Sequence, residues 1–390
     1  MKIYRYLILA AIVLLLFVGV APLAAETQEL KQKMEVLEQQ LNDLQKQLSG
    51  QRQDLDENRQ EQVKLSSLAG GLKLLGEHVT ISGCVEVEVG FTEDYDGNDE
   101  SDITLATVEL GIDIDLHKYV SAHILLLWEE DDTEPVDLDE AYLTLGNTEH
   151  FPVFLQAGKF YVPFGNFESH MISDPLTLEL GETRESAVLL GFEQAGFRVG
   201  VYAFNGDIDE AEDDNEIKCF GLSTGYAFEN DNFSLDVGAD WINNLADSDT
   251  LGDALPESIR DYVDGFTAHA VFSWQGLTLI GEYLAANDDF AVDELEFKGK
   301  GAKPEAWNVE LGYTFAVAGR EAFVAVAWQG TDEALALELP EDRYLGSVGV
   351  ELFPGIGLAL EYAHDEDYGV GDGGSGKTAD TVTLQLALEF

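Results

Sequence analysis

Thr381-Val-Thr-Leu-Gln-Leu-Ala-Leu-Glu-Phe390 ends the chain and decides its fold. Its apolar residues alternate with polar or small ones, and a period of two predicts a β-strand. One face of this strand would be apolar and the other polar, which suits lipid outside and water inside. We therefore interpret it as the closing strand of an outer-membrane β-barrel, with Phe390 in an aromatic girdle. The last strand of a soluble sandwich fits this stretch alone equally well.

The sequence upstream favours the barrel. After Gly76, sixteen candidate strands follow one another, and tight turns alternate with longer, mostly acidic connections. An even number of strands and this alternation are typical of outer-membrane barrels, and a sandwich does not need them. The fold class is therefore an all-β transmembrane barrel of about sixteen antiparallel strands. The predicted strands are 79–91, 102–116, 119–129, 138–146, 152–160, 185–193, 197–204, 218–228, 233–243, 264–274, 277–287, 306–316, 321–330, 342–352, 356–365 and 379–390.

Aromatic residues recur near both ends of these strands, where a membrane barrel carries its two aromatic girdles. With the tight turns facing the periplasm, one group would lie at the periplasmic rim and the other toward the outer rim. The residues expected toward the outer rim are Trp128, Tyr202, Trp241, Tyr283, Trp307, Trp328 and Tyr362.

Residues 1–25 predict a secretory signal peptide. Lys2 and Arg5 precede an apolar run from Leu7 to Val20, and small residues lead to Ala25. This is the order of regions that a signal peptide has, and the run is shorter than the ~20 apolar residues of a spanning helix. We expect removal after Ala25 and export to the outer membrane of a Gram-negative bacterium.

Residues 26–69 predict an α-helical coiled coil in the periplasm, followed by a linker at 70–78 and the barrel at 79–390. Apolar residues are spaced alternately by four and three, as at the a and d positions of heptads. This implies a homo-oligomer, with a trimer favoured, although nearly uniform Leu leaves the number of helices open. A single amphipathic helix lying on another surface is the alternative. The core positions are Leu30, Met34, Leu37, Leu41, Leu44 and Leu48.

The composition is strongly acidic. Asp and Glu number 75 against 21 Lys and Arg, for a formal net charge of -54. Such a chain repels nucleic acid and attracts cations. A phosphate-selective porin would need rings of Arg and Lys in its lumen, so we keep that function only as an alternative.

The acidic connections are expected to form an outer rim that is bridged to lipopolysaccharide by divalent cations. Hard cations take carboxylate oxygens as ligands, but no connection has the ligand spacing of a dedicated Ca²⁺ loop. The connections are Glu93–Asp102, Glu129–Glu140, Asp207–Glu216, Asp247–Asp264 and Asp365–Asp372.

The connection between the fifth and sixth strands, 161–184, is different because it is rich in apolar residues. These residues need something to bury against, and the barrel interior is the nearest place. We expect an inward constriction loop that narrows the pore; a lid over the barrel mouth is the alternative. The polar residues that would line the constriction are Glu168, His170, Asp174, Glu179, Glu182 and Arg184.

Gly158-Lys-Phe-Tyr-Val-Pro-Phe-Gly165, which runs on through Asn166 to Arg184, resembles the corresponding stretch of the LbtU family of siderophore porins. That family also pairs a leading coiled-coil segment with a sixteen-stranded barrel. The resemblance implies passage of a ferric siderophore, or a comparable small solute, across the outer membrane. It carries over no binding motif residue by residue, and a shorter Pro-Phe-Gly stretch also occurs in phosphate-selective porins.

Nucleotide binding and catalysis are not expected. Gly371–Thr378 has the spacing of a Walker A loop, but a strand follows it where phosphate binding requires a helix. His170 with Ser169 or Ser173 is the only candidate dyad, and adjacent residues rarely form a productive one. We expect no catalytic residue, no cofactor and no metal site.

These patterns together predict a passive diffusion channel, with size exclusion at the inward loop and an acidic lumen that favours cations. The alternative is a structural protein whose coiled coil tethers the cell envelope and whose pore is incidental.

Overall fold

The computed structural model describes residues 76, 78–130, 133, 135–211 and 216–390. The chain divides into two units, Met1–Lys73 and Leu74–Phe390. The predicted signal peptide, the coiled coil and most of the linker lie outside the described residues. Within the described part, no helix has the length and apolar character needed to cross a membrane.

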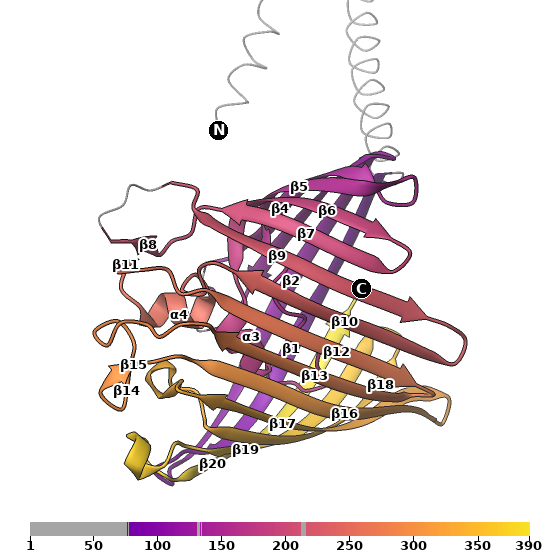
Figure 1. Ribbon diagram of the computed structural model, residues 1–390. Helices are drawn as coiled ribbons and strands as arrows, with labels where there is room; N and C mark the ends of the chain where they lie inside the picture. Colours follow the sequence, from indigo (N-terminus) through magenta and orange to yellow (C-terminus); the bar gives the residue numbers. More distant parts are fainter. Residues whose placement is uncertain (1–75, 77, 131–132, 134, 212–215) are drawn as a thin grey trace, which may run out of the picture. The chain divides into compact units, whose positions relative to one another are not determined.

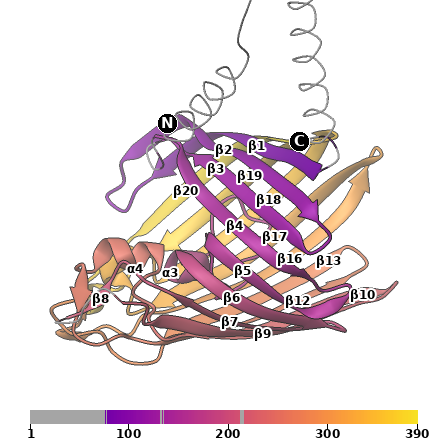
Figure 2. The same cartoon turned by 90° about the horizontal axis from the view of Figure 1, so that it is seen from above.

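The second unit is a closed barrel of sixteen antiparallel strands in which β1 pairs with β20 (Figures 1 and 2). The predicted barrel and its closing strand are confirmed. The barrel strands are β1 (Val79–Glu93), β2 (Asp99–His117), β3 (Val120–Trp128), β4 (Asp137–Asn147), β5 (Phe151–Tyr161), β6 (Arg184–Gln194), β7 (Phe197–Phe204), β9 (Cys219–Glu229), β10 (Phe233–Ile242), β12 (Gly265–Trp274), β13 (Leu277–Ala286), β16 (Glu305–Val317), β17 (Arg320–Asp332), β18 (Asp342–Phe353), β19 (Ile356–Glu366) and β20 (Thr378–Glu389).

Alternation along β20 separates an outer face from an inner face. Val382, Leu384, Leu386 and Leu388 are 37% to 47% exposed, whereas Thr383 between them is 9% exposed. Directly paired residues of neighbouring strands point to the same face, so the register carries this assignment around the barrel. A continuous exposed apolar outer face is what a lipid-facing barrel wall presents.

Three of the tight turns show why the sequence turns where it does. Ala195-Gly196, Gln275-Gly276 and Ala318-Gly319 all have positive φ at both residues. This is the conformation of a type I′ turn, whose twist matches that of the two strands it joins. We call this end of the barrel the turn side, and the end with the longer connections the loop side.

The first acidic connection is shorter than predicted. We expected a long loop over Glu93–Asp102, but β1 runs to Glu93 and β2 begins at Asp99. Asp94 Oδ1 accepts hydrogen bonds from the N–H groups of Asp96 and Asn98, at 2.8 Å each. A side chain that bonds its own following backbone closes a local turn, so no longer loop is needed.

Tyr202 was placed at the outer aromatic rim, and this was wrong. Its side chain lies on the inner face of β7 and is 3% exposed. It pairs with Gly221 of β9, and a Cβ atom at that glycine would overlap the tyrosine ring. The missing side chain therefore makes room for a large ring inside the barrel.

The longer connections contain short elements that the sequence did not reveal. Many of their apolar side chains form one core with inner-face residues of β6, β7, β9, β10, β13 and β16, so the core fills one side of the barrel interior on the loop side. The elements are α3 (Leu176–Gly181), β8 (Asp209–Glu210), α4 (Asp249–Ala254), β11 (Ser258–Ile259), β14 (Glu296–Phe297), β15 (Lys300–Gly301), η1 (Leu335–Leu337) and η2 (Val370–Asp372).

Candidate functional site

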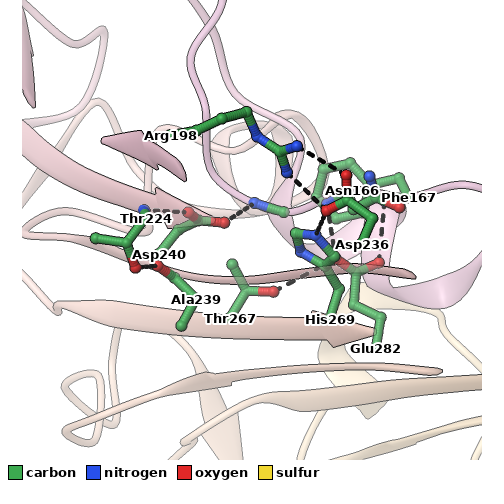
Figure 3. A network of polar contacts seen from close by, with 11 residues as sticks. Asn166, Phe167, Arg198, Thr224, Asp236, Ala239, Asp240, Thr267, His269 and Glu282 are labelled. Carbon is green, nitrogen blue, oxygen red and sulfur yellow. Dashed lines mark hydrogen bonds and ion pairs between the residues drawn. The ribbon is translucent and has the colours of Figure 1, made fainter. Parts of the chain in front are cut away.

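The connection between β5 and β6, residues 162–183, lies against the inner face of the barrel. Four carboxylates project from that face, one each on β10, β13, β16 and β19, and backbone N–H groups of the connection donate to them in chain order. Figure 3 shows the first two, Asp240 and Glu282. The bonds run from Gly165 to Asp240 Oδ2 (3.1 Å), from Asn166 and Phe167 to Glu282 Oε1 and Oε2 (2.8 and 3.1 Å), from His170 to Glu310 Oε1 (2.8 Å), and from Ile172 and Ser173 to Glu361 Oε2 and Oε1 (2.5 and 3.1 Å).

We call Asp240, Glu282, Glu310 and Glu361 the carboxylate ladder. All four side chains are buried, and a buried carboxylate is tolerated only when hydrogen bonds satisfy its oxygens. The irregular backbone of the connection has the complementary need, because its N–H groups also require partners once buried. The ladder therefore fixes residues 165–173 along the inner wall from β10 to β19.

The second half of the connection is held by packing. Leu176 and Leu180 of α3 are 0% exposed, and Leu180 belongs to the core that also contains Leu284 of β13 and Phe290. Thr177 Oγ1 donates to Glu282 Oε2 at 3.0 Å, so α3 and residues 165–167 share one anchor. The apolar residues of this connection are thus buried, as Phe164, Leu176 and Leu180 are, or half-buried, as Phe167 and Leu178 are.

Three of the six predicted residues, Asp174, Glu179 and Glu182, are not packed into this core and lie near one another. Asp174 is exposed, but the surrounding wall still restricts its hydration. This loss of hydration, followed by the charge of Glu179, then Glu129 and Glu88, raises the pKa of Asp174 to about 6. Its carboxylate is therefore mostly ionised at neutral pH.

Glu182 is half-buried at the end of α3. Burial, followed by the charges of Asp249, Asp174 and Asp139, raises the pKa of Glu182 to about 8. Its backbone C=O accepts from the Asp249 N–H of α4 at 3.0 Å. Most Glu182 side chains are therefore protonated and uncharged at neutral pH.

Glu168 and His170 lie in the other part of the connection. Glu168 is exposed, while His170 Nδ1 is 2.5 Å from Glu310 Oε1. The hydrogen bond with Glu310 raises the pKa of His170 against the effect of burial, and the nearby charge of Glu168 adds to it. His170 therefore serves as a second anchor to the ladder.

Arg184, the sixth predicted residue, is the first residue of β6 and bonds to Asp139 of β4 through its guanidinium group. Asp137 lies 3.4 Å from the same nitrogen. Two carboxylates thus offset its charge, and the structure does not bring it together with Glu168 and His170.

Ser169 and Ser173, the candidates for a dyad with His170, have other hydrogen-bond partners. Ser169 Oγ donates to Glu310 Oε2 at 2.8 Å, and Ser173 Oγ donates to Glu361 Oε1 at 2.5 Å. Each hydroxyl thus supports the ladder. Within the described ranges, no group of three or more His, Cys, Asp or Glu side chains is arranged to hold a metal ion.

The barrel interior has two unlike halves. On the middle and loop-side parts of β6 to β19, which we call the covered half, inner-facing side chains such as Asn308 and Ser347 are at most 1% exposed. On β1 to β4, which we call the open half, the inner-facing Asp113 and His123 side chains are 50% and 20% exposed. The connection and the core thus fill one half and leave the other accessible to water.

A cavity of about 390 Å³ lies on the turn side of the connection. His170, Met171 and Ile172 form one side of it, and β17 to β20 with Glu86 of β1 form the other. Four carboxylates line it and, among the described residues, no Lys or Arg does. These carboxylates belong to Glu86, Glu321, Glu351 and Glu389.

Solved structures share this architecture. The outer-membrane channel DcaP of Acinetobacter baumannii superposes with a TM-score of 0.56 at 16% identity, covering 80% of this chain and 97% of that one. An anion-selective porin from Comamonas acidovorans gives 0.56 at 15% identity, covering 80% and 99%. Pseudomonas putida OprB gives 0.59 at 11% identity, covering 82% and 96%. The chain therefore has the fold of the outer-membrane porins.

The sequence is also similar to UPF0422 proteins. That of Coxiella burnetii is 29% identical over 335 residues, covering 80% of this chain and 72% of the relative. That of Legionella pneumophila strain Lens is 29% identical over 358 residues, covering 80% of this chain. The chain spans 66% of the length of this Legionella relative. No family model matches the sequence.

Proposed function

We propose that the protein is a porin-type channel for passive diffusion across the outer membrane of a Gram-negative bacterium. The observation that carries this proposal is the carboxylate ladder, which bonds residues 165–173 to the inner wall. A segment held in this way narrows a barrel without filling it, and the open half stays accessible to water. The known channels with the same fold support this function.

The lumen is expected to favour cations. The charge of Asp174 interacts with those of Glu88 and Glu129. The inner-facing residues of the open half include Glu86, Glu88, Glu109 and Glu140 but, among those described, no Lys or Arg. Rings of acidic side chains select cations in channels. The wall here thus has the opposite sign from that expected of the anion-selective porin that shares the fold.

Inward-facing arginines do not reverse this field, because each has a carboxylate partner. Arg198 Nη1 and Nη2 donate to Asp236 at 2.7 and 2.6 Å (Figure 3). Arg343 donates to Asp365 through Nε and Nη2 at 2.8 and 3.0 Å. A phosphate-selective pore would need basic groups free to bind its solute, so this pairing argues against that alternative.

The identity of the transported solute is a second part of the proposal. The resemblance of Gly158–Arg184 to the LbtU family supports a ferric siderophore or a comparable small solute. An acidic path restricts that choice to complexes that are neutral or positively charged. The trimeric periplasmic coiled coil, the rim of lipopolysaccharide and divalent cations, and the alternative envelope tether rest on sequence predictions alone.

Planar-bilayer conductance of the refolded full chain, with reversal potentials under a salt gradient at pH 7.5, tests the channel. We expect stepwise conductance with cation preference. A double variant, Asp174→Asn with Glu179→Gln, should lower the cation-to-anion permeability ratio by about five-fold, because about 1 kcal/mol of attraction is lost at ~4 Å in water. Asp231→Asn, in the exposed turn between β9 and β10, is the matched control and should change little. A folded barrel without conductance would contradict the function.

A further inference from the structure

The covered half is closed on the loop side. Leu245, Leu251 and Phe290 come from the connections after β10 and β13 and pack, at most 2% exposed, onto the inner wall. Met171 covers Ala327, Leu345 and Ala363 on β17, β18 and β19. Interiors packed in this way leave few voids larger than a water molecule, so a solute cannot enter through this half.

The ladder carboxylates are also unavailable to a solute. The oxygens of Glu282 and Glu361 bond to backbone N–H groups of the connection, at 2.5 to 3.1 Å. Glu310 is occupied in the same way by the N–H of His170 and the hydroxyl of Ser169. These charges hold the connection in place and do not line a route through the barrel.

Among the described residues, the open half has carboxylates at equivalent inward positions, such as Glu86 and Glu88, that are only half-buried. Glu88 of β1 pairs with Gln385 of β20, whose Nε2 donates to Glu88 Oε1 at 2.9 Å and to Glu86 Oε2 at 3.4 Å. This amide orients both glutamates on the inner wall, and Glu86 also lines the turn-side cavity. On the connection, Asp174 lies close enough to Glu88 for the two carboxylate charges to interact.

We infer that solutes pass off the barrel axis, along the inner faces of β1 to β4, and that Glu88 with Asp174 opposite sets the charge selectivity. Glu86 then receives the solute in the turn-side cavity. His170 lines that cavity while it is anchored to Glu310. The Arg184 guanidinium is held by Asp137 and Asp139 of β4, which offset its charge. The inference rests on the proposed channel function and adds selectivity residues on the wall that faces the connection.

Cysteine accessibility tests the route in a cysteine-free background, Cys84→Ser with Cys219→Ser. Glu88→Cys places a thiol in the open half, and Ser347→Cys places one of nearly native size in the covered half. During single-channel recording, a cationic methanethiosulfonate reagent should reduce the current through Glu88→Cys by at least half and leave Ser347→Cys unchanged. Glu109→Cys on β2 is a second open-half position if Glu88→Cys does not fold.

A selectivity measurement complements the labelling. Glu88→Gln should lower the cation-to-anion permeability ratio several-fold, and Asp174→Asn should do the same, while Asp231→Asn should leave it unchanged. Reaction at Ser347→Cys equal to that at Glu88→Cys, or unaltered selectivity in Glu88→Gln, overturns the off-axis route although the channel still conducts. Absence of current in the wild-type barrel instead overturns the channel function itself.

Discussion

Glu282 and Glu88 show how differently the two halves of the barrel use one residue type. Both are glutamates at inward positions of a strand, Glu282 on β13 and Glu88 on β1. In the covered half, Glu282 accepts two backbone N–H groups and a hydroxyl from the connection. In the open half, Glu88 meets only a glutamine side chain among the hydrogen bonds described. The role of an inward carboxylate is therefore decided by what covers it.

The difference follows from the cost of desolvation. A carboxylate removed from water must receive hydrogen bonds of comparable strength, or it takes up a proton. The connection between β5 and β6 provides those bonds along one wall and ends before reaching the other. The same sequence feature, an acidic residue at an inward position of a strand, thus stabilises one half and gives the other its electric field.

Removing the Glu282 carboxylate is expected to have the largest effect on the free energy of unfolding. Glu282→Ala leaves two N–H groups of the connection and the Thr177 and Thr267 hydroxyls without their acceptor. At about 1 kcal/mol or more for each, the free energy of unfolding should fall by about 4 kcal/mol. Denaturant unfolding of the refolded barrel measures it.

Glu109→Ala in the open half is the matched control, because that side chain is only half-buried and does not belong to the ladder. We expect a change within about 0.5 kcal/mol, as for surface substitutions. Equal losses in the two variants would show that coverage does not distinguish the halves.

Loosening the packing of α3 should have the next largest effect on the free energy of unfolding. Leu180→Ala removes a side chain that is 0% exposed, and buried Leu→Ala substitutions cost about 2 to 5 kcal/mol. We expect about 3 kcal/mol, together with noisier single-channel current because the connection loosens. Leu178→Ala, on the half-buried side of the same helix, should cost under about 1 kcal/mol. A quiet, unaltered channel in Leu180→Ala would mean that α3 does not hold the constriction.

The strand pattern could be predicted from the sequence because alternation and turn chemistry are local. Apolar residues from Val382 to Leu388 alternate with polar or small ones, and the two residues Gln275-Gly276 are enough to indicate a turn. The failure at Tyr202 has a non-local reason, since its inward position depends on room left by Gly221 on the neighbouring strand. One sequence does not reveal which residues become neighbours.

The candidate site was predicted only in outline for the same reason. The apolar content of 161–184 identified the distinctive connection, and Asp174, Glu179 and Glu182 do lie together. The ladder was missed, although each member stands out as an acidic residue between apolar neighbours, as in Val309-Glu310-Leu311. That pattern is also present where a carboxylate faces water, so it does not identify which carboxylates accept backbone N–H groups.

The pH dependence of selectivity sharpens the comparison further. Because lost hydration and neighbouring charges raise the pKa of Asp174 to about 6, its carboxylate is mostly neutral below that pH and mostly charged above it. Cation preference should therefore rise between about pH 5 and pH 7, and Asp174→Asn should flatten this rise. Reversal potentials at a fixed salt gradient measure both. A rise that survives unchanged in Asp174→Asn would assign the titration to another group.

Glu182, at the boundary between the halves, gives the smallest effect at neutral pH. Burial and then the charge of Asp249 raise its pKa to about 8, so near pH 7 most of the population is already uncharged. Glu182→Gln should then leave selectivity at pH 7 nearly unchanged and reduce it at pH 9, where the wild-type side chain is ionised. Glu168→Gln is the control, since Glu168 is exposed and lies on the part of the connection that is bonded to β13 and β16. A loss in Glu182→Gln that is as large at pH 7 as at pH 9 would mean that Glu182 is charged at neutral pH and belongs to the open half.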